Sequence, residues 1–320
     1  MKICVIFTGG TIGSALENGY ISLSADKRHE LTEHYLRTDK DTELETTELF
    51  SVLSENMSAP LVSRLAETVC EKEKQNYDGI IVAHGTDTLQ YSANAVSACA
   101  SGRMPIVFVS ANYPLGDKRS NGHDNFSAAV KFIKSGLKNG VFISYKNEGE
   151  NTKIHYAPLV MSHGEGDDKL YSIHKVCAEE IDGKIVSVNP DESFAGMGYT
   201  EFAEDNKILV LHSALGVNYR CDLDDIKSVI LVPYHSGTVN TEDADLQRLC
   251  RTAAERHIPV FLSMARFEDM YLTAREYSAM NIIPVPLPFI AIYMRLWRAI
   301  SGGYDDLSDV FKTISGKISS

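Results

Sequence analysis

The sequence predicts an α/β fold with two domains, a larger N-terminal domain on a doubly wound, mostly parallel sheet and a smaller C-terminal α/β domain. The chain has 320 residues, more than the roughly 250 to 300 at which a single hydrophobic core usually stops growing. Its composition, 44% hydrophobic and 23% charged residues, is typical of a folded globular protein. Short apolar segments of strand type alternate along the chain with segments of helical period, as expected for a sheet covered by helices.

Four strands are predicted in the N-terminal part of the chain. Each is a short apolar run, rich in β-branched residues, that is followed by Gly, Asn, Asp or Thr; the runs cover residues 3–7, 79–83, 106–109 and 141–144. Runs that are apolar throughout, without alternation, are typical of parallel strands buried on both faces.

Helices are predicted between these strands. Leu61, Leu65 and Val69 recur at a spacing of four residues, and Ala93, Val96 and Ala100 repeat a similar spacing after the second strand. Such spacing places the apolar side chains on one face of a helix. Strand and helix therefore alternate, which favours a doubly wound sheet.

A linker is predicted at residues 181–206, where acidic residues, glycines and one proline occur without a sustained period. This boundary gives an N-terminal catalytic domain at 1–180 and a C-terminal domain at 207–320. A second strand and helix series follows the linker; it consists of strands at 207–212, 229–232 and 259–262 and a helix at about 242–256, with residues 241–244 supplying the N-cap.

The charge balance excludes two classes of partner. Lys and Arg total 31 against 43 Asp and Glu, which gives a formal net charge of −12. Affinity for nucleic acid depends largely on cationic side chains that neutralise phosphates. We therefore expect neither nucleic acid nor an anionic membrane surface as a general partner.

The chain is expected to be cytoplasmic and to contain no membrane span. Its first apolar run leads directly into the sequence TGG, which leaves no room for the hydrophobic core of a signal peptide. The most apolar stretch, 282–294, is shorter than the ~18 residues of a span and holds three prolines. The six cysteines are scattered without a CxxC pair, so free thiols are expected.

Two loops that follow predicted strands carry hydroxyl groups. The first is TGGTIG at residues 8–13, and the second is HGTDT at 84–88. Taken singly, the first indicates a tight turn and the second a helix N-cap, and neither has the glycine pattern of a nucleotide loop. The carboxyl ends of parallel strands meet at one edge of a sheet. Together the loops therefore place Thr11, Thr86 and the carboxylate of Asp87 where a hydrolase with a hydroxyl nucleophile needs them.

These two motifs resemble the signature motifs of the bacterial-type L-asparaginases, the amidohydrolases that convert asparagine to aspartate and ammonia. The similarity extends over residues 3–155 in the family's order. Gly19 and Tyr20 resemble the mobile-lid tyrosine segment of the family, LSENM at 53–57 its substrate-binding serine segment, RSNG at 119–122 with Asn125 its Ser-Asp-Gly stretch, and NTK at 151–153 its catalytic lysine segment.

The resemblance implies roles for five catalytic residues. Thr11 would attack the side-chain amide, with Tyr20 accepting or relaying the hydroxyl proton, to give an acyl-enzyme and ammonia. Thr86, Asp87 and Lys153 would form a set in which Asp87 holds Lys153 and Lys153 accepts the proton of Thr86. Either threonine can be the first nucleophile at this level.

The resemblance also implies how a free amino acid would be held. Ser54 and backbone amides suit the α-carboxylate, whereas Asp87 and Glu55 suit the α-ammonium. Gly85 and Thr86 complete the expected substrate-binding residues, and backbone N–H groups near the two threonines would form the oxyanion site. The family often has glutamine at the position of Glu55, so the choice between asparagine and glutamine stays open.

Neither a metal nor an organic cofactor is expected. Histidines at 155, 163 and 174 lie near acidic residues 165, 167 and 168, but no HExxH or comparable ligand spacing is present. The family's shared pocket implies a homodimer or homotetramer. Two other functions stay open: a non-catalytic amino-acid-binding protein, and the ammonia-producing subunit of an amidotransferase that acts on tRNA, against which the acidic balance argues.

Overall fold

The computed structural model describes residues 1–10, 12, 14–17, 20–23, 25–164, 166–173, 176–189, 194–265 and 271–311, with the backbone alone at 14–17, 20–23 and 25–29. The chain divides into two compact units, Met1–Glu201 and Phe202–Ser320.

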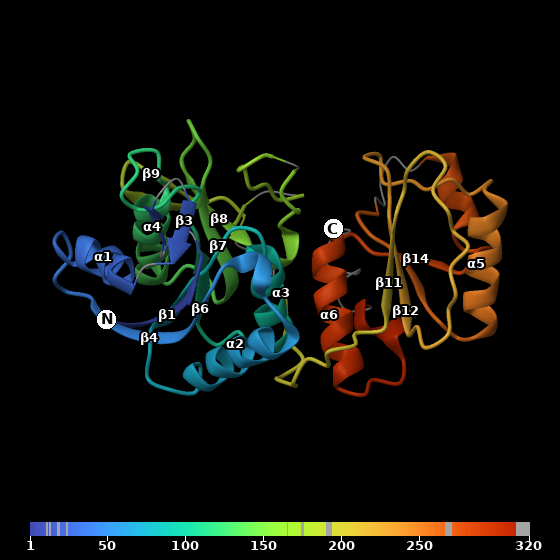
Figure 1. Ribbon diagram of the computed structural model, residues 1–320, viewed down its shortest axis with the longest axis horizontal. Helices are drawn as coiled ribbons and strands as arrows, with labels where there is room; N and C mark the ends of the chain where they lie inside the picture. Colours follow the sequence, from blue (N-terminus) through green and yellow to red (C-terminus); the bar gives the residue numbers. More distant parts are fainter. Residues whose placement is uncertain are drawn as a thin grey trace. The chain divides into compact units, whose positions relative to one another are not determined.

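The first unit is built on an eight-stranded sheet in the order β10-β9-β8-β7-β6-β5-β1-β4 (Figure 1). Its strands are β1 (Lys2–Gly9), β4 (Glu43–Val52), β5 (Gly79–Ala83), β6 (Pro105–Val109), β7 (Gly140–Lys146), β8 (Thr152–Tyr156), β9 (Ala178–Ile181) and β10 (Lys184–Ser187). From β4 to β7 all neighbours are parallel, and from β7 to β10 they are antiparallel. The predicted mostly parallel sheet is confirmed.

Helices cover both faces of this sheet. They are α1 (Ala25–Leu36), α2 (Ala59–Lys72), α3 (Leu89–Cys99) and α4 (Gly122–Ser135); a hairpin of β2 (Ser14–Glu17) and β3 (Tyr20–Leu23) precedes α1. Helices α2 and α3 contact each other, as do α1 and α4. The sheet is therefore doubly wound, as predicted.

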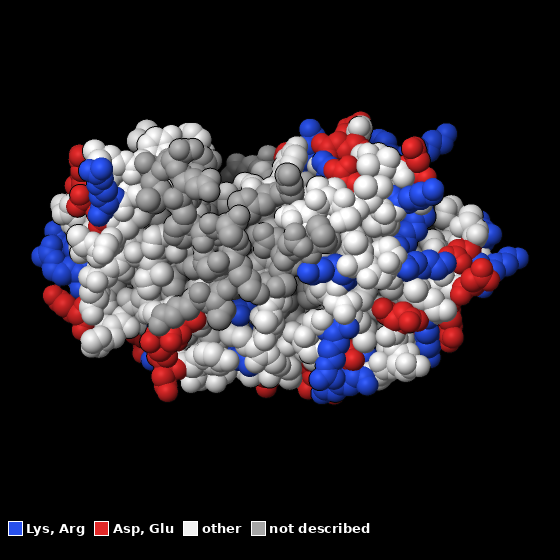
Figure 2. All heavy atoms as spheres, turned by 180° about the vertical axis from the view of Figure 1, so that it is seen from behind, with Lys and Arg blue, Asp and Glu red and all other residues white. Residues whose placement is uncertain are grey.

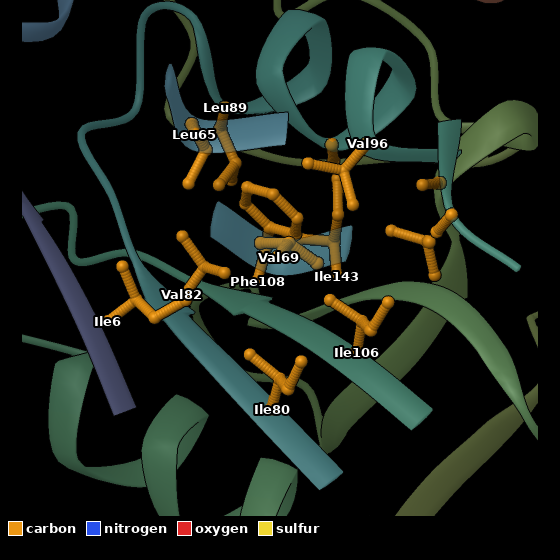
Figure 3. Packing of buried hydrophobic residues seen from close by; sticks show 14 of the residues in the cluster. Ile6, Leu65, Val69, Ile80, Val82, Leu89, Val96, Ile106, Phe108 and Ile143 are labelled. Atoms are coloured by element: carbon orange, nitrogen blue, oxygen red, sulfur yellow. The ribbon is translucent and has the colours of Figure 1, made fainter. Parts of the chain in front are cut away.

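The main core lies between the sheet and the pair α2 and α3 (Figure 3). Alternate strand residues point to this side, for example Ile6, Val82 and Phe108, and they meet Val69 of α2 and Val96 of α3. On the other face α4 packs by its aromatic residues, such as Phe132, whose ring lies 4.8 Å from that of Phe142. Of the residues predicted to form these helical faces, Leu65, Val69, Ala93, Val96 and Ala100 lie in this core, whereas Leu61 is only partly buried.

The predicted linker at 181–206 contains the division between the two compact units, but it also contains a strand of the first unit. Lys184–Ser187 forms β10, which pairs with β9 as the edge of the sheet. The two strands are joined by Asp182 and Gly183, both with positive φ (49° and 77°). An Asp-Gly pair at this position is a strong local signal for a tight hairpin. Along the chain the first compact unit ends at Glu201 and the second begins at Phe202, so residues up to 201 belong to the N-terminal unit.

The second unit has a parallel sheet in the order β11-β12-β13-β14. Its elements are β11 (Ile208–His212), β12 (Ser228–Val232), α5 (Ala244–Glu255), β13 (Val260–Leu262), β14 (Ile282–Pro284) and α6 (Phe289–Ser301), with 3-10 turns at Leu272–Glu276 and Leu307–Phe311. Asp243 caps α5, because its side chain accepts hydrogen bonds from the backbone N–H groups of Asp245 and Leu246. The smaller C-terminal α/β domain is confirmed.

Two further predictions can be compared with this fold. All six cysteines are free thiols, as predicted. Within the part of the chain that the structure describes, no helix has both the length and the apolar character to cross a lipid bilayer.

Candidate active site

The site forms where β1 and β5 end side by side at one edge of the sheet. Phe7 and Ala83 are paired in register, and the buried hydroxyl of Thr8 donates a hydrogen bond of 2.9 Å to the carbonyl of Ala83. The chain then turns at Gly10, whose N–H donates to the carbonyl of Val52 at 3.0 Å. The ends of three strands, β1, β4 and β5, are thereby tied together.

Gly10 and Gly85 bring the two motif loops into direct contact. A Cβ atom on Gly10 would lie 2.2 Å from the Cα of Gly85, and Gly10 has a φ of +80°. No side chain fits this approach, and L-residues rarely adopt that φ. These glycines immediately precede Thr11 and Thr86, 75 positions apart in the sequence, so the contact joins the two segments that the family resemblance pairs.

Ser54 supports the second loop from the other side. It lies in the 3-10 turn Ser54–Asn56 that follows β4 and is only 5% exposed. Its hydroxyl donates to Oδ2 of Asp87 and accepts from the backbone N–H of Asp87, both at 3.2 Å. Its carbonyl accepts from the hydroxyl of Thr88 at 2.9 Å. Gly85 is therefore held between Gly10 and Ser54.

Ser54→Ala is expected to raise the KM for an amino-acid substrate about tenfold with a smaller change in kcat. The variant removes both hydrogen bonds to Asp87, and bonds to a charged group contribute about 1.5 to 3 kcal/mol. Steady-state kinetics measure the effect. Thr42→Ala is a control for loss of a buried hydroxyl that bonds to a carboxylate, since the Thr42 hydroxyl donates to Asp39 at 3.0 Å. An unchanged KM in Ser54→Ala would contradict a role in substrate binding.

Thr86 and Asp87 lie just before α3. Thr86 is partly exposed and Asp87 is exposed. The carbonyl of Thr86 accepts from the N–H of Leu89 at 3.3 Å. Among the described residues, neither the hydroxyl nor the backbone N–H of Thr86 has a hydrogen-bond partner. The N-terminus of a helix carries a partial positive charge. This edge of the sheet thus offers a partly exposed hydroxyl, an N–H donor with no acceptor among the described residues, and a carboxylate.

Lys153 has a different partner from the expected one. Its Nζ lies 2.5 Å from Oε2 of Glu150, in the turn between β7 and β8, whereas Asp87 bonds to Ser54. The hydrogen bond from Lys153 holds the pKa of the Glu150 carboxyl below its usual value. Lys153 pairs with Glu150 because the two residues are three positions apart and face each other across a tight turn. An acidic residue at this spacing is visible in the sequence.

Lys153 nevertheless lies on the side of the sheet that α2 and α3 cover. Lys153 pairs in register with Tyr145, and directly opposed residues of neighbouring strands point to the same side. Tyr145 belongs to the core under α2 and α3. The catalytic role of Lys153 stays a prediction.

Asn121 of the RSNG segment and Asn125 hold strand ends through their side-chain amides. Asn125 is fully buried; its Nδ2 donates to the carbonyl of Ser110 at 2.8 Å and its Oδ1 accepts from the N–H of Lys146 at 2.8 Å. Asn121 donates to the carbonyl of Lys146 at 2.9 Å. These amides join the ends of β6 and β7 to the start of α4.

The structure describes some of the other predicted site residues, one of them by its backbone alone, and the rest lie outside the described residues. Thr11 and Gly19 lie outside them, and for Tyr20 the backbone alone is described, at the start of β3. Glu55 is exposed beside Ser54. Glu165 and His174 also lie outside, and among the described residues no group of three His, Cys, Asp or Glu side chains is arranged to hold a metal ion.

Comparisons with known proteins identify the family and the fold of this chain. A family model for the N-terminal domain of asparaginases matches residues 2–189. One subunit of the glutamyl-tRNA(Gln) amidotransferase of Methanosphaera stadtmanae is 24% identical over 97% of this chain and 74% of its own length. An L-asparaginase of Thermococcus kodakarensis is 30% identical over 46% of this chain and 45% of its own length. The solved structure of the thermostable L-asparaginase from that organism superposes with a TM-score of 0.76 at 22% identity, covering 98% of this chain and 96% of that one.

Proposed function

The chain belongs to the asparaginase family, and we propose that it is an L-asparagine amidohydrolase that releases L-aspartate and ammonia through a threonine acyl-enzyme. The observation that carries the proposal is the contact of Gly10 with Gly85, which joins the two threonine loops beside Ser54 and Asp87. An amide hydrolase that uses a hydroxyl nucleophile needs such convergence of hydroxyl, donor and carboxylate groups.

In the proposed reaction the Thr11 oxygen attacks the side-chain amide carbon while Tyr20 takes the hydroxyl proton. The C–N bond of the tetrahedral intermediate breaks, and ammonia leaves after its nitrogen has received that proton. Water then attacks the ester, its proton returns to the Thr11 oxygen, and aspartate is released. Thr86 and Lys153 are proposed to assist proton transfer, with Glu150 as the neighbour of Lys153.

Substrate binding is proposed to redistribute the hydrogen bonds of Ser54. Its hydroxyl now donates to the Asp87 carboxylate. On binding, this hydroxyl would turn to the α-carboxylate of the amino acid, which frees Asp87 to pair with the α-ammonium group. Such pairing favours a free amino acid over an asparagine within a peptide, whose α-groups carry no charge.

The proposal is tested by ammonia release from L-asparagine and L-glutamine with the purified protein. We expect turnover of asparagine. An inactive protein that binds asparagine would contradict the proposal and support an amino-acid-binding protein instead. We also propose that the enzyme works in the cytoplasm as a homodimer or homotetramer and without a metal or organic cofactor.

Glu55→Gln is expected to change the ratio of kcat/KM for asparagine to that for glutamine. Glu55 is exposed and adjacent to Ser54 in the same turn, so its carboxylate lies near the proposed binding site for the α-groups. A second carboxylate there attracts the ammonium but repels the α-carboxylate. Glu48→Gln is a control that also removes one acidic charge, from β4. An unaltered ratio in Glu55→Gln would remove this residue from the pocket.

A second candidate function is the production of ammonia for an amidotransferase. It is favoured by the similarity to a glutamyl-tRNA(Gln) amidotransferase component over 97% of this chain. The net charge of −12 argues against direct contact with tRNA. On the face drawn in Figure 2, Lys and Arg side chains of the described residues are interspersed with Asp and Glu. Amidation of glutamyl-tRNA in the presence of a co-purified partner would support this candidate.

A further inference from the structure

We infer that His84 is a positioning residue that directs the backbone N–H of Thr86 toward the oxygen of the substrate amide, an inference that rests on the proposed hydrolase function. His84 precedes the Gly85–Thr86 peptide and its side chain is 1% exposed. Its Nδ1 lies 2.9 Å from the carbonyl oxygen of Gly85. No role for its imidazole arises from the proposed reaction steps themselves.

The hydrogen bond identifies the tautomer of His84. A carbonyl oxygen only accepts, so Nδ1 must carry the hydrogen. Burial lowers the pKa of His84 to about 4, and the ring is therefore neutral near pH 7 with a single N–H group. Nε2 is then an acceptor, and it is buried without a hydrogen-bond partner among the described residues. The one donor of this side chain is committed to Gly85.

The same bond fixes the direction of a neighbouring donor. The carbonyl of Gly85 and the N–H of Thr86 belong to one planar trans peptide and point in opposite directions. Because the carbonyl points to His84, the N–H points away from it. This N–H has no acceptor within the described part of the chain. It is thus free to bond to a substrate atom.

Apart from the bond to His84, no described contact fixes the orientation of the Gly85–Thr86 peptide. Gly85 has no Cβ, so either orientation of the following peptide is open to it. Contacts with Gly10 and Ser54 hold the position of Gly85, and Ser54 holds the N–H of Asp87. Neither contact bonds to the Gly85 carbonyl. Among the described residues, the bond from His84 is the one that orients this carbonyl.

An N–H in this position would act on the transition state. When a hydroxyl attacks an amide, the carbonyl oxygen gains negative charge, and a donor aimed at that oxygen stabilises the charge as it develops. A misdirected N–H should therefore lower kcat and leave KM nearly unchanged. A general loss of structure is expected to change kcat and KM together.

The test compares His84→Leu with His84→Asn in asparagine hydrolysis. Leucine fills the space without a donor, and we expect kcat to fall about 10- to 30-fold with KM within about threefold of wild type. The Asn amide can place a donor near the position of Nδ1, so His84→Asn should restore kcat to within about threefold of wild type. Equal losses in both variants would overturn the inference.

Thr8→Val is the matched control. It removes an equally buried bond to a backbone carbonyl, that of Ala83, at 2.9 Å. The N–H of that peptide belongs to His84 and bonds to Val109 at 2.9 Å, so it faces the sheet and not the pocket. We expect lower thermal stability with kcat within about threefold of wild type. A loss of kcat equal to that of His84→Leu would overturn the inference.

Nitrogen NMR of histidine-labelled wild-type protein gives a readout that is independent of activity. We expect His84 as the Nδ1–H tautomer, and an Nε2–H tautomer would overturn the inference even if the leucine variant fails to fold. An inactive wild-type enzyme would overturn the proposed function and this inference together. An active enzyme whose His84→Leu variant keeps its kcat would overturn this inference alone.

Discussion

Thr11→Ala and Thr86→Val are each expected to lower kcat for asparagine hydrolysis by about 1000-fold. The first variant removes the proposed nucleophile. The second removes the hydroxyl of the partly exposed Thr86. This hydroxyl has no hydrogen-bond partner among the described residues, and valine preserves the shape of the side chain. Residues that act as one unit lose activity non-additively, so the double variant should be little worse than either single variant.

The measurement is ammonia release, together with mass spectrometry of the protein during turnover. If Thr11 attacks first, the Thr86→Val protein should carry an acyl group on Thr11. Thr88→Val is the control, because its hydroxyl bonds to the carbonyl of Ser54 at 2.9 Å and is not proposed to react; its kcat should stay within about tenfold of wild type. Unchanged rates in both Thr11→Ala and Thr86→Val would reject the threonine mechanism.

Gly10→Ala is expected to lower kcat/KM about 100-fold or more. The added Cβ would lie 2.2 Å from the Cα of Gly85, so the two loops must move apart. A displacement of about 1 Å between catalytic groups can cost about 100-fold in rate. The positive φ of Gly10 adds a backbone strain of about 1 to 2 kcal/mol. Kinetics and thermal unfolding measure the two effects separately.

Gly102→Ala separates backbone strain from the clash. Gly102 also has a positive φ, +69°, but a Cβ there meets nothing within 4 Å. It lies just before β6, at the edge of the sheet opposite to the strand ends that form the site. We expect a modest loss of stability and wild-type kinetics. If Gly10→Ala were as active as Gly102→Ala, the loop contact would not matter for catalysis.

Much of the fold could be predicted from local patterns. The strands at 79–83 and 106–109 are apolar throughout, and they form β5 and β6 as expected. The sequence between 181 and 206 has no sustained period and predicts a linker, whereas residues 184–187 form β10. The Asp-Gly pair at 182 and 183 was the signal for the β9–β10 hairpin.

The sequence indicates residues for the candidate site but not the contacts between them. LSENM and HGTDT indicate Ser54, Thr86 and Asp87, and the structure places Ser54 against the HGTDT loop. The partner of Lys153 was expected to be Asp87 and is Glu150. Nothing in the sequence indicated that His84 bonds to its neighbouring carbonyl, since a histidine beside a glycine has many possible orientations.

The sequence by itself determined where β5 and β6 end, which glycines and hydroxyls lie at the ends of β1 and β5, and which family the chain resembles. These properties depend on residues close together along the chain, whose turn preferences and apolar periods can be read locally. Only the tertiary structure decided that Gly10 meets Gly85, that Ser54 rather than Lys153 holds Asp87, and that one N–H of the second loop has no acceptor among the described residues. Such contacts depend on strand order, register and the packing of α3 on the sheet, which join segments that are far apart in the chain.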